Sequence, residues 1–178
     1  MRPAAVVVSA LAPAWLASTA LYNQVIDTTY GAVQGNAAFA SQPSTNISNW
    51  ADITVWKGIP FAADTSGLNR FRPPQKRAAW NTTWLTSEYG DVCPGQNSFG
   101  GPPTKRKRKT GGNTSDNTTS SEDCLNLNIW TSAFSTEPKL PVMIWSYPAG
   151  GSAAQPLFDG AGMAAKGIVY VNSNYRNA

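Results

Sequence analysis

The 178-residue chain contains no histidine, and this absence limits the chemistry that its own residues can perform. A serine nucleophile of the usual kind needs a histidine to accept the proton of its hydroxyl group. The chain also lacks the G-x-S-x-G turn that would expose such a serine at the end of a strand. We therefore expect that these residues alone cannot assemble a complete serine–acid–histidine triad.

Charged residues make up only 13% of the chain, and the formal charge of +4 is concentrated in few places. The run Lys105 to Lys109 contains five of the fourteen basic residues, and Arg2 lies close to the N-terminus. The other residues contribute eight basic and ten acidic side chains, a net charge of −2. Overall basicity therefore gives no support for nucleic-acid binding. We interpret the basic run as part of a solvated loop, because no aromatic residues are interleaved with it. A dibasic processing site is an alternative.

No apolar run reaches the roughly 20 residues that a membrane-spanning helix needs. Residues 1–20 instead combine Arg2, an apolar middle and the small residues Ser18-Thr19-Ala20. This layout is typical of a secretory signal peptide, and we expect cleavage after Ala20. A buried N-terminal helix is the alternative, but Pro3 and Pro13 and the missing polar face disfavour it. The pattern predicts a secreted protein with no integral membrane segment after cleavage.

Cysteines are scarce too, since only Cys93 and Cys124 are present. Behind a secretory leader, a disulfide between them is the default expectation. Residues 94–123 between them are rich in Gly, Pro, Ser and Thr, so we expect a flexible loop without a core of its own. Four Asn-x-Ser/Thr acceptors behind a leader favour a glycoprotein; they lie at Asn46, Asn81, Asn113 and Asn117.

Short strand patterns precede and follow this loop. Residues 25–35 and 53–56 favour short strands, which predicts a small antiparallel sheet. Within 122–131, Leu125, Leu127 and Ile129 alternate with Asn126, Asn128 and Trp130, as in a strand with one apolar face.

The last forty residues suggest a crossover in a mostly parallel sheet. The apolar run 142–145 predicts a strand covered on both faces. It is followed by a glycine loop, a short helix over 161–166 and a strand over 168–171. Since nothing in the chain follows to cover it, we expect the strand at 168–171 to have a bare apolar edge and the isolated chain to be poorly soluble.

The order of several short strings is characteristic. GIPFA, RFRPP, tryptophan, YG and CP occur within residues 58–94, and EDCLNLNIW follows at 122–130. These strings resemble the type-B carboxylesterase family, which includes the cholinesterases and many fungal secreted lipases. The chain looks like a fungal-type secreted member. The resemblance implies an α/β-hydrolase fold, serine-dependent hydrolysis of a small-molecule ester or lipid, and no metal or cofactor.

The resemblance also implies roles for particular residues. Arg70 and Glu122 would form a structural ion pair, with two independent surface charges as the alternative. The disulfide would close the family's flap beside the active site. That loop contains no tryptophan here, so binding of a quaternary ammonium group is unsupported. The oxyanion-hole N–H donors would be those of Ala149 and Gly150, or in a shifted frame those of Gly150 and Gly151. An ordinary tight loop is the alternative.

In this family the nucleophile elbow follows the NYR string, which here occupies 174–176. We therefore expect residues 21–178 to be the N-terminal portion of such a hydrolase domain, truncated before the elbow and inactive alone. The truncation has three possible origins: the sequence is a fragment, an incomplete gene model or a decayed copy. A non-catalytic binding or adhesion protein on the same scaffold is the second hypothesis. A secreted module acting through Lys105 to Lys109 is the third.

Overall fold

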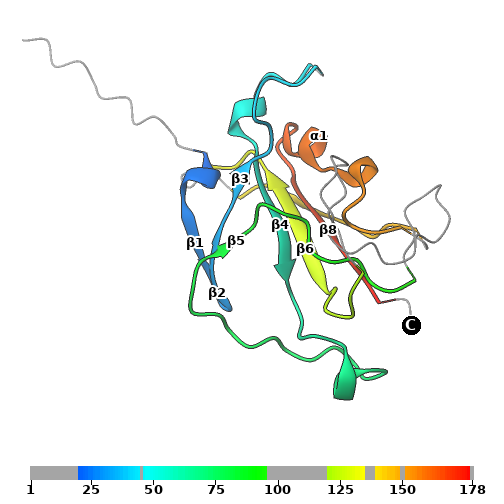
Figure 1. The fold of residues 1–178 in the computed structure, drawn as a ribbon. Helices are drawn as coiled ribbons and strands as arrows, with labels where there is room; N and C mark the ends of the chain where they lie inside the picture. The colour runs from blue at the N-terminus through cyan, green and yellow to red at the C-terminus, as the bar shows by residue number, and fades with distance from the viewer. Residues whose placement is uncertain (1–19, 45, 96–119, 135–138, 149–150, 177–178) are drawn as a thin grey trace, which may run out of the picture.

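The described part of the chain forms a three-stranded sheet, a five-stranded sheet and one short α-helix (Figure 1). A computed structural model provides this structure and describes residues 20–44, 46–95, 120–134, 139–148 and 151–176. Within those ranges no helix has the length and apolarity needed to cross a membrane. Single-turn 3-10 helices connect some of the strands: η1 (Leu21–Asn23), η2 (Trp50–Asp52), η3 (Gly67–Asn69) and η4 (Pro156–Phe158).

The smaller sheet begins with a hairpin of β1 (Val25–Thr28) and β2 (Gly31–Gln34), which pair antiparallel as the sequence predicts. A third strand of two residues, β5 (Trp84–Leu85), pairs parallel to β2. Trp80 holds the segment before β5 on the hairpin, because its Nε1 donates to a hairpin carbonyl at 2.9 Å. A side chain at Gly31 would collide with the Trp80 ring, so this close approach requires glycine.

The larger sheet contains the other five strands: β3 (Asn36–Ala37), β4 (Thr54–Pro60), β6 (Asn126–Thr131), β7 (Val142–Trp145) and β8 (Val169–Ser173). Their order in the sheet is β3-β4-β6-β8-β7. β4 pairs antiparallel with β3 and β6, and β6 pairs antiparallel with β8. β7 and β8 are parallel, and the chain passes through helix α1 (Ala161–Ala164) between them. The predicted crossover is therefore confirmed, but the expectation of a mostly parallel sheet is wrong for the larger sheet, since β7 and β8 form the one parallel pair among its described strands.

A bulge in β4 brings its backbone close to a neighbouring segment. The register of β4 against β6 shifts between Trp56 and Ile59. Gly58 in the bulge has a φ of 66°, and a Cβ atom there would lie 2.8 Å from the Glu88 carbonyl oxygen. Its N–H donates to Asn128 Oδ1 at 2.9 Å. Both the backbone conformation and the close approach therefore require glycine at this position.

The main hydrophobic core lies between α1 and the larger sheet. Figure 1 shows α1 next to one end of β8. Trp130 of β6 and Tyr170 of β8 meet edge to face, with ring centroids 5.8 Å apart. Burial raises the pKa of the Tyr170 hydroxyl, and the negative charge of Asp159 raises it further. The small side chains of Ala161 and Ala164 in α1 are buried in the same core as these rings. The other buried members of this core are Ile53 and Val55.

The expectation of an apolar face on β6 is wrong for the strand itself. The buried residues of β6 are Asn126, Asn128, Trp130 and Thr131, whereas Leu127 and Ile129 are only half-buried. The alternation exists, but the amides occupy the inner face because hydrogen bonds to other segments satisfy them. Burial of a polar group then carries little cost, and hydropathy alone assigns the wrong face.

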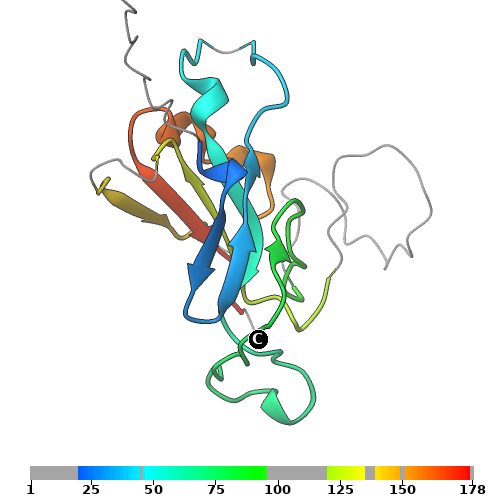
Figure 2. The ribbon, with the colours of Figure 1, turned by 90° about the vertical axis from the view of Figure 1, so that its left-hand side faces the viewer.

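The expectation that residues 142–145 are covered on both faces is also wrong. β7 is the edge strand of the larger sheet, and all four of its residues are exposed, including Val142 at 64% and Ile144 at 73%. Figure 2 shows β7 outermost, beyond β8. The bare apolar edge therefore belongs to β7 and not to residues 168–171, because β6 and β7 cover β8 on its two sides.

We expect this edge to make isolated residues 21–178 self-associate, because an exposed apolar edge strand is a template for pairing. Ile144→Lys places a charge in the middle of the edge and should raise the monomer fraction severalfold in light scattering and size-exclusion chromatography. Ser146→Lys is the matched control, since it adds the same charge just beyond the strand at an exposed residue. Equal rescue by both variants would attribute the effect to net charge and contradict a role for the edge.

Candidate functional site

The candidate site is the turn between β7 and η4, where the sequence predicts oxyanion donors. Ala149 and Gly150 lie outside the described residues, but the third candidate, Gly151, is described and buried. The Gly151 N–H donates to the carbonyl oxygen of Pro148 at 3.2 Å. A Cβ atom on Gly151 would lie 3.1 Å from the Tyr147 ring, so the packing favours glycine there. This N–H is therefore already engaged within the turn.

Tyr147, at the start of the turn, is fixed on both sides of its ring and at its hydroxyl. Its ring stacks on Tyr175, with centroids 4.8 Å apart, and on Phe158, with centroids 5.8 Å apart. Its hydroxyl donates to Asn174 Oδ1 at 3.0 Å. The Tyr175 hydroxyl in turn donates to the Tyr147 carbonyl oxygen at 3.2 Å. Tyr147 is 3% exposed, so these contacts are formed away from water.

Ala153, at the other end of the turn, has both of its backbone groups bound by asparagine side chains. Its N–H donates to Asn174 Oδ1 at 2.9 Å. Its carbonyl oxygen accepts from Asn128 Nδ2 and Asn172 Nδ2, each at 3.2 Å. Asn128 and Asn172 lie directly opposite one another in β6 and β8 and also bond to each other at 2.8 Å. The turn is thus anchored to the middle of the larger sheet.

These asparagines were not among the residues predicted for the site. Asn128, Asn172 and Asn174 are 1%, 0% and 2% exposed, and Asn126 is 6% exposed. One signal could have found them, because Asn-x-Asn occurs twice, at 126–128 and at 172–174. Two polar positions with the same period in two paired strands indicate a shared buried face when both strands otherwise contain apolar residues.

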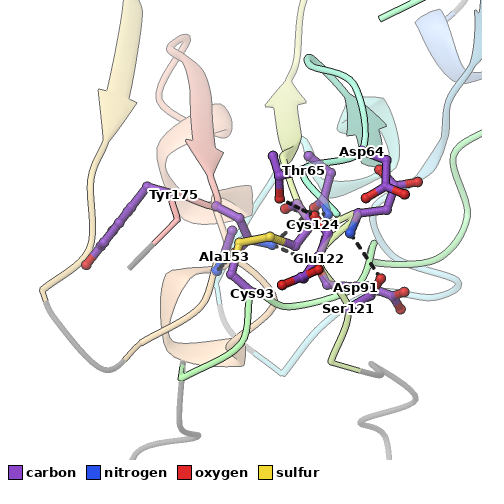
Figure 3. The surroundings of a disulfide bond; sticks show 12 residues. Asp64, Thr65, Asp91, Cys93, Ser121, Glu122, Cys124, Ala153 and Tyr175 are labelled. Atoms are coloured by element: carbon purple, nitrogen blue, oxygen red, sulfur yellow. Dashed lines mark hydrogen bonds between the residues drawn. A yellow bond between two sulfur atoms is a disulfide. The ribbon is translucent and has the colours of Figure 1, made fainter. Parts of the chain in front are cut away.

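The predicted disulfide between Cys93 and Cys124 is confirmed, with a Cα–Cα distance of 5.0 Å (Figure 3). Both cysteines are fully buried and pack with Ala62 and Leu125. The base of the loop is closed further by a hydrogen bond from the Ser121 N–H to the Val92 carbonyl oxygen at 3.0 Å. Residues 96–119, with the basic run Lys105 to Lys109, lie outside the described residues.

Arg70 and Glu122 form an ion pair in the structure, with Arg70 Nε 2.9 Å from Glu122 Oε1. The Arg70 side chain is 62% exposed and that of Glu122 is 29% exposed. An ion pair this open to solvent contributes about 0–1 kcal/mol to stability, well below the cost of breaking a buried pair. The Glu122 backbone is held independently, because its carbonyl oxygen accepts from Thr65 Oγ1 at 2.6 Å. The loop base therefore does not depend on this ion pair.

The other predicted site residues are the glycan acceptors. Asn46 and Asn81 are both exposed, as attachment of a glycan requires. Asn113 and Asn117 lie outside the described residues, and so do residues 1–19 of the predicted leader.

The chain is similar to known proteins over most of its length. A sequence model described as the carboxylesterase family matches residues 22–178. The chain is 40% identical over 128 residues to the fumonisin B1 esterase of Sphingopyxis macrogoltabida, covering 70% of this chain and 22% of that protein. It is 31% identical over 160 residues to the para-nitrobenzyl esterase of Bacillus subtilis, covering 86% of this chain and 28% of that protein.

Solved structures agree with these relatives. A PNB esterase structure matches with a TM-score of 0.63 at 29% identity, covering 86% of this chain and 28% of that chain. The carboxylesterase EST55 of Geobacillus stearothermophilus matches with a TM-score of 0.60 at 29% identity, covering 85% of this chain and 26% of that chain. The fold is therefore that of the α/β-hydrolases. The chain spans about a quarter of the length of these proteins.

The disulfide closes a loop with a sequence separation of 31 residues, and the loop-entropy relation values such a closure at roughly 3.5–4 kcal/mol. We expect the double substitution Cys93→Ser/Cys124→Ser to lower the free energy of unfolding by about that amount in urea titrations followed by tryptophan fluorescence. Dithiothreitol should destabilise the parent protein to the same level and leave the double variant unchanged. A parent protein whose midpoint does not move on reduction would contradict a stabilising role.

Proposed function

The chain belongs to the carboxylesterase family, and from this membership we propose that it is the N-terminal part of a hydrolase of small carboxylic esters. One geometric observation supports the proposal most directly. A glycine-containing turn follows β7, the strand parallel to β8, and buried side chains hold Tyr147 and Ala153 on its two sides. Donors that stabilise a developing oxyanion must be positioned before the reaction, and the anchoring of Tyr147 and Ala153 supports such a role for the residues between them.

We propose that the oxyanion donors are the N–H groups of Ala149 and Gly150. The hydrogen bond from the Gly151 N–H to Pro148 supports this choice over the shifted frame, because an N–H that already has an acceptor is less available to a substrate. Pro148 has no N–H and needs none in this arrangement. A serine, an acid and a histidine from outside these 178 residues would complete the reaction, since the chain contains no histidine. Residues 1–178 alone should therefore be inactive.

We further propose that the protein is a secreted glycoprotein whose signal peptide ends at Ala20, similar to fungal secreted esterases and lipases. The buried disulfide supports an oxidising compartment. The exposure of Asn46 and Asn81 supports their use as glycan acceptors.

The test of the activity uses the whole protein that contains this chain, with 4-nitrophenyl acetate as the ester. Ala149→Pro removes one proposed donor and should lower kcat by about 10²–10³-fold, the usual effect of losing an oxyanion-hole donor. Pro148→Ala changes the neighbouring residue in the opposite sense, by adding an N–H, and should keep kcat within a few-fold of the parent. Unchanged kcat in Ala149→Pro would favour the shifted frame, whereas a parent protein without turnover would contradict the proposed function.

The test of glycosylation uses secretion from a eukaryotic host. We expect Asn46→Gln and Asn81→Gln each to remove one glycan, visible as a step in electrophoretic mobility that an N-glycosidase abolishes in the parent. Thr83→Ala should have the same effect as Asn81→Gln, because it destroys the acceptor triplet without touching the asparagine. Thr83→Ser retains the triplet and should retain the glycan. A protein that stays inside the cell and has no mobility step would contradict both secretion and glycosylation.

A further inference from the structure

A cavity of about 250 Å³ lies beside the disulfide, and no residue of the candidate turn lines it. Its walls come from three segments: the end of β4, residues 77–91, and residues 123–126 on either side of Cys124. All three segments belong to the described structure. The cavity is therefore formed by residues of this chain alone.

Covalent and hydrogen bonds tie the three walls together. The Lys57 N–H of β4 donates to the Thr86 carbonyl oxygen at 3.0 Å, which joins the first segment to the second. Asn126 Nδ2 donates to the Asp91 carbonyl oxygen at 2.9 Å, so the second segment is joined to the third, and the disulfide adds a covalent link between them. A cavity whose walls are fixed before binding loses little conformational freedom when a ligand enters.

Aromatic and aliphatic side chains form part of the lining, namely those of Trp84, Tyr89 and Leu125. The Trp84 ring packs against Trp80, with ring centroids 5.4 Å apart, and this contact restricts its orientation. These side chains offer an apolar surface on which the C–H groups of a ligand can pack.

A cation and an anion complete the lining, and the contact between them is long. Arg77 Nη1 lies 3.4 Å from Asp123 Oδ1, and the guanidinium carbon of Arg77 lies 5.4 Å from the centroid of the Trp84 ring. The Arg77 side chain is 23% exposed and that of Asp123 is 46% exposed. Within the ranges that the structure describes, neither the guanidinium nor the carboxylate has a second hydrogen bond. Most N–H donors of Arg77 and one oxygen of Asp123 are therefore available to a ligand.

The presence of both charges restricts the kind of ligand that fits. A small cation would be repelled by Arg77, and a small anion by Asp123. A purely apolar ligand would remove both charges from water without giving them a partner. A neutral hydroxyl group avoids these costs, since it donates to a carboxylate and accepts from a guanidinium. A pyranose ring combines several hydroxyl groups with an apolar C–H face, which matches the charged pair and the aromatic wall.

We propose that this cavity is a saccharide-binding site, which holds one neutral pyranose ring with its C–H face on Trp84 and its hydroxyl groups on Arg77 and Asp123. The volume supports a single ring, because it lies below the roughly 300–1,000 Å³ of sites for drug-sized ligands. The site serves recognition and not catalysis. It goes beyond the proposed ester hydrolysis and does not depend on it.

Isothermal titration calorimetry on the whole protein that contains this chain tests the proposal, with N-acetylglucosamine and methyl β-glucopyranoside as probes. The protein carries Asn81→Gln, so that a glycan on this acceptor, three residues before Trp84, cannot occupy the cavity. We expect one site with a Kd of about 1 mM for at least one sugar, since a ligand with few atoms gains little binding free energy. Absence of binding for both sugars up to about 50 mM would overturn the proposal. Displacement of the sugar by sodium acetate or methylammonium chloride, beyond the effect of sodium chloride, would also overturn it.

Asp123→Asn is the principal variant, and Glu122→Gln is its matched control. Both replace a carboxylate with an amide in adjacent residues that each belong to an ion pair, but only Asp123 lines the cavity. Ion pairs this open to solvent contribute little to stability, so both variants should keep thermal midpoints close to that of the parent. We expect the Kd to rise at least about fivefold in Asp123→Asn and to stay within about twofold in Glu122→Gln. Equal affinities in the two variants would refute the site.

Arg77→Gln and Arg70→Gln repeat this comparison with the cations. Arg70 pairs with Glu122 and does not line the cavity, whereas Arg77 lines it. The Kd should rise at least about fivefold in Arg77→Gln alone, because the charged donors to the sugar hydroxyls are lost. Parent affinity in Arg77→Gln would contradict the proposal even if Asp123→Asn does not fold.

Ester turnover separates this inference from the proposed function. Hydrolysis of 4-nitrophenyl acetate by Asp123→Asn should stay within about twofold of the parent, because distant sites contribute independently. A parent protein without turnover would refute the proposed function, and the sugar titrations would still decide on the saccharide site. Joint loss of turnover and sugar binding in Asp123→Asn would indicate a general structural defect and count against the site.

Discussion

The architecture of the larger sheet depends on a row of buried asparagine amides between β6 and β8, all of which need hydrogen-bond partners. A buried amide without a partner costs about 1–3 kcal/mol, so four unsatisfied amides could consume most of a domain's stability. Their partners come from four separate segments, namely the β4 bulge, Asp91 near the disulfide, the turn after β7, and η4. Satisfying the amides therefore determines where these four segments lie on the sheet.

This constraint also explains why a polar face of β6 points inward. Trp130 brings that face against Tyr170 and α1, and the strand's period of two then carries Asn126 and Asn128 inward with it. The alternative register would bury Leu127 and Ile129 but expose Trp130 and separate the amides of Asn126 and Asn128 from their partners. Burial of the Trp130 ring and pairing of the amides together stabilise the fold more than burial of two aliphatic side chains would. Each aliphatic side chain contributes about 1.5–3 kcal/mol when fully buried.

Features that depend on short-range pattern could be predicted from the sequence. The hairpin at 25–35, the crossover after 142–145 and the disulfide follow from turn residues, apolar runs and the only two cysteines. The inner face of β6 and the edge position of β7 could not, because both depend on which strands become neighbours in space. A hydropathy scale also places asparagine at the surface. It contains no information on the backbone groups of Gly58 and Ala153, which form hydrogen bonds with the buried asparagine side chains. The position of the candidate turn follows from the resemblance, but the residues that anchor it lie in β6, in β8 and directly after β8.

Only one orientation of the Asn174 amide satisfies all its neighbours. Its oxygen faces two donors, the Tyr147 hydroxyl and the Ala153 N–H, and its nitrogen faces the Asp91 carbonyl oxygen. Rotating the amide by half a turn would oppose donor to donor at the Ala153 N–H and acceptor to acceptor at the Asp91 carbonyl oxygen. The disulfide restricts the segment that carries Asp91, so it also restricts this orientation. The loop base, the amide and the turn therefore form one mechanically connected unit, in which covalent closure at Cys93 limits how far the backbone at Ala153 can move.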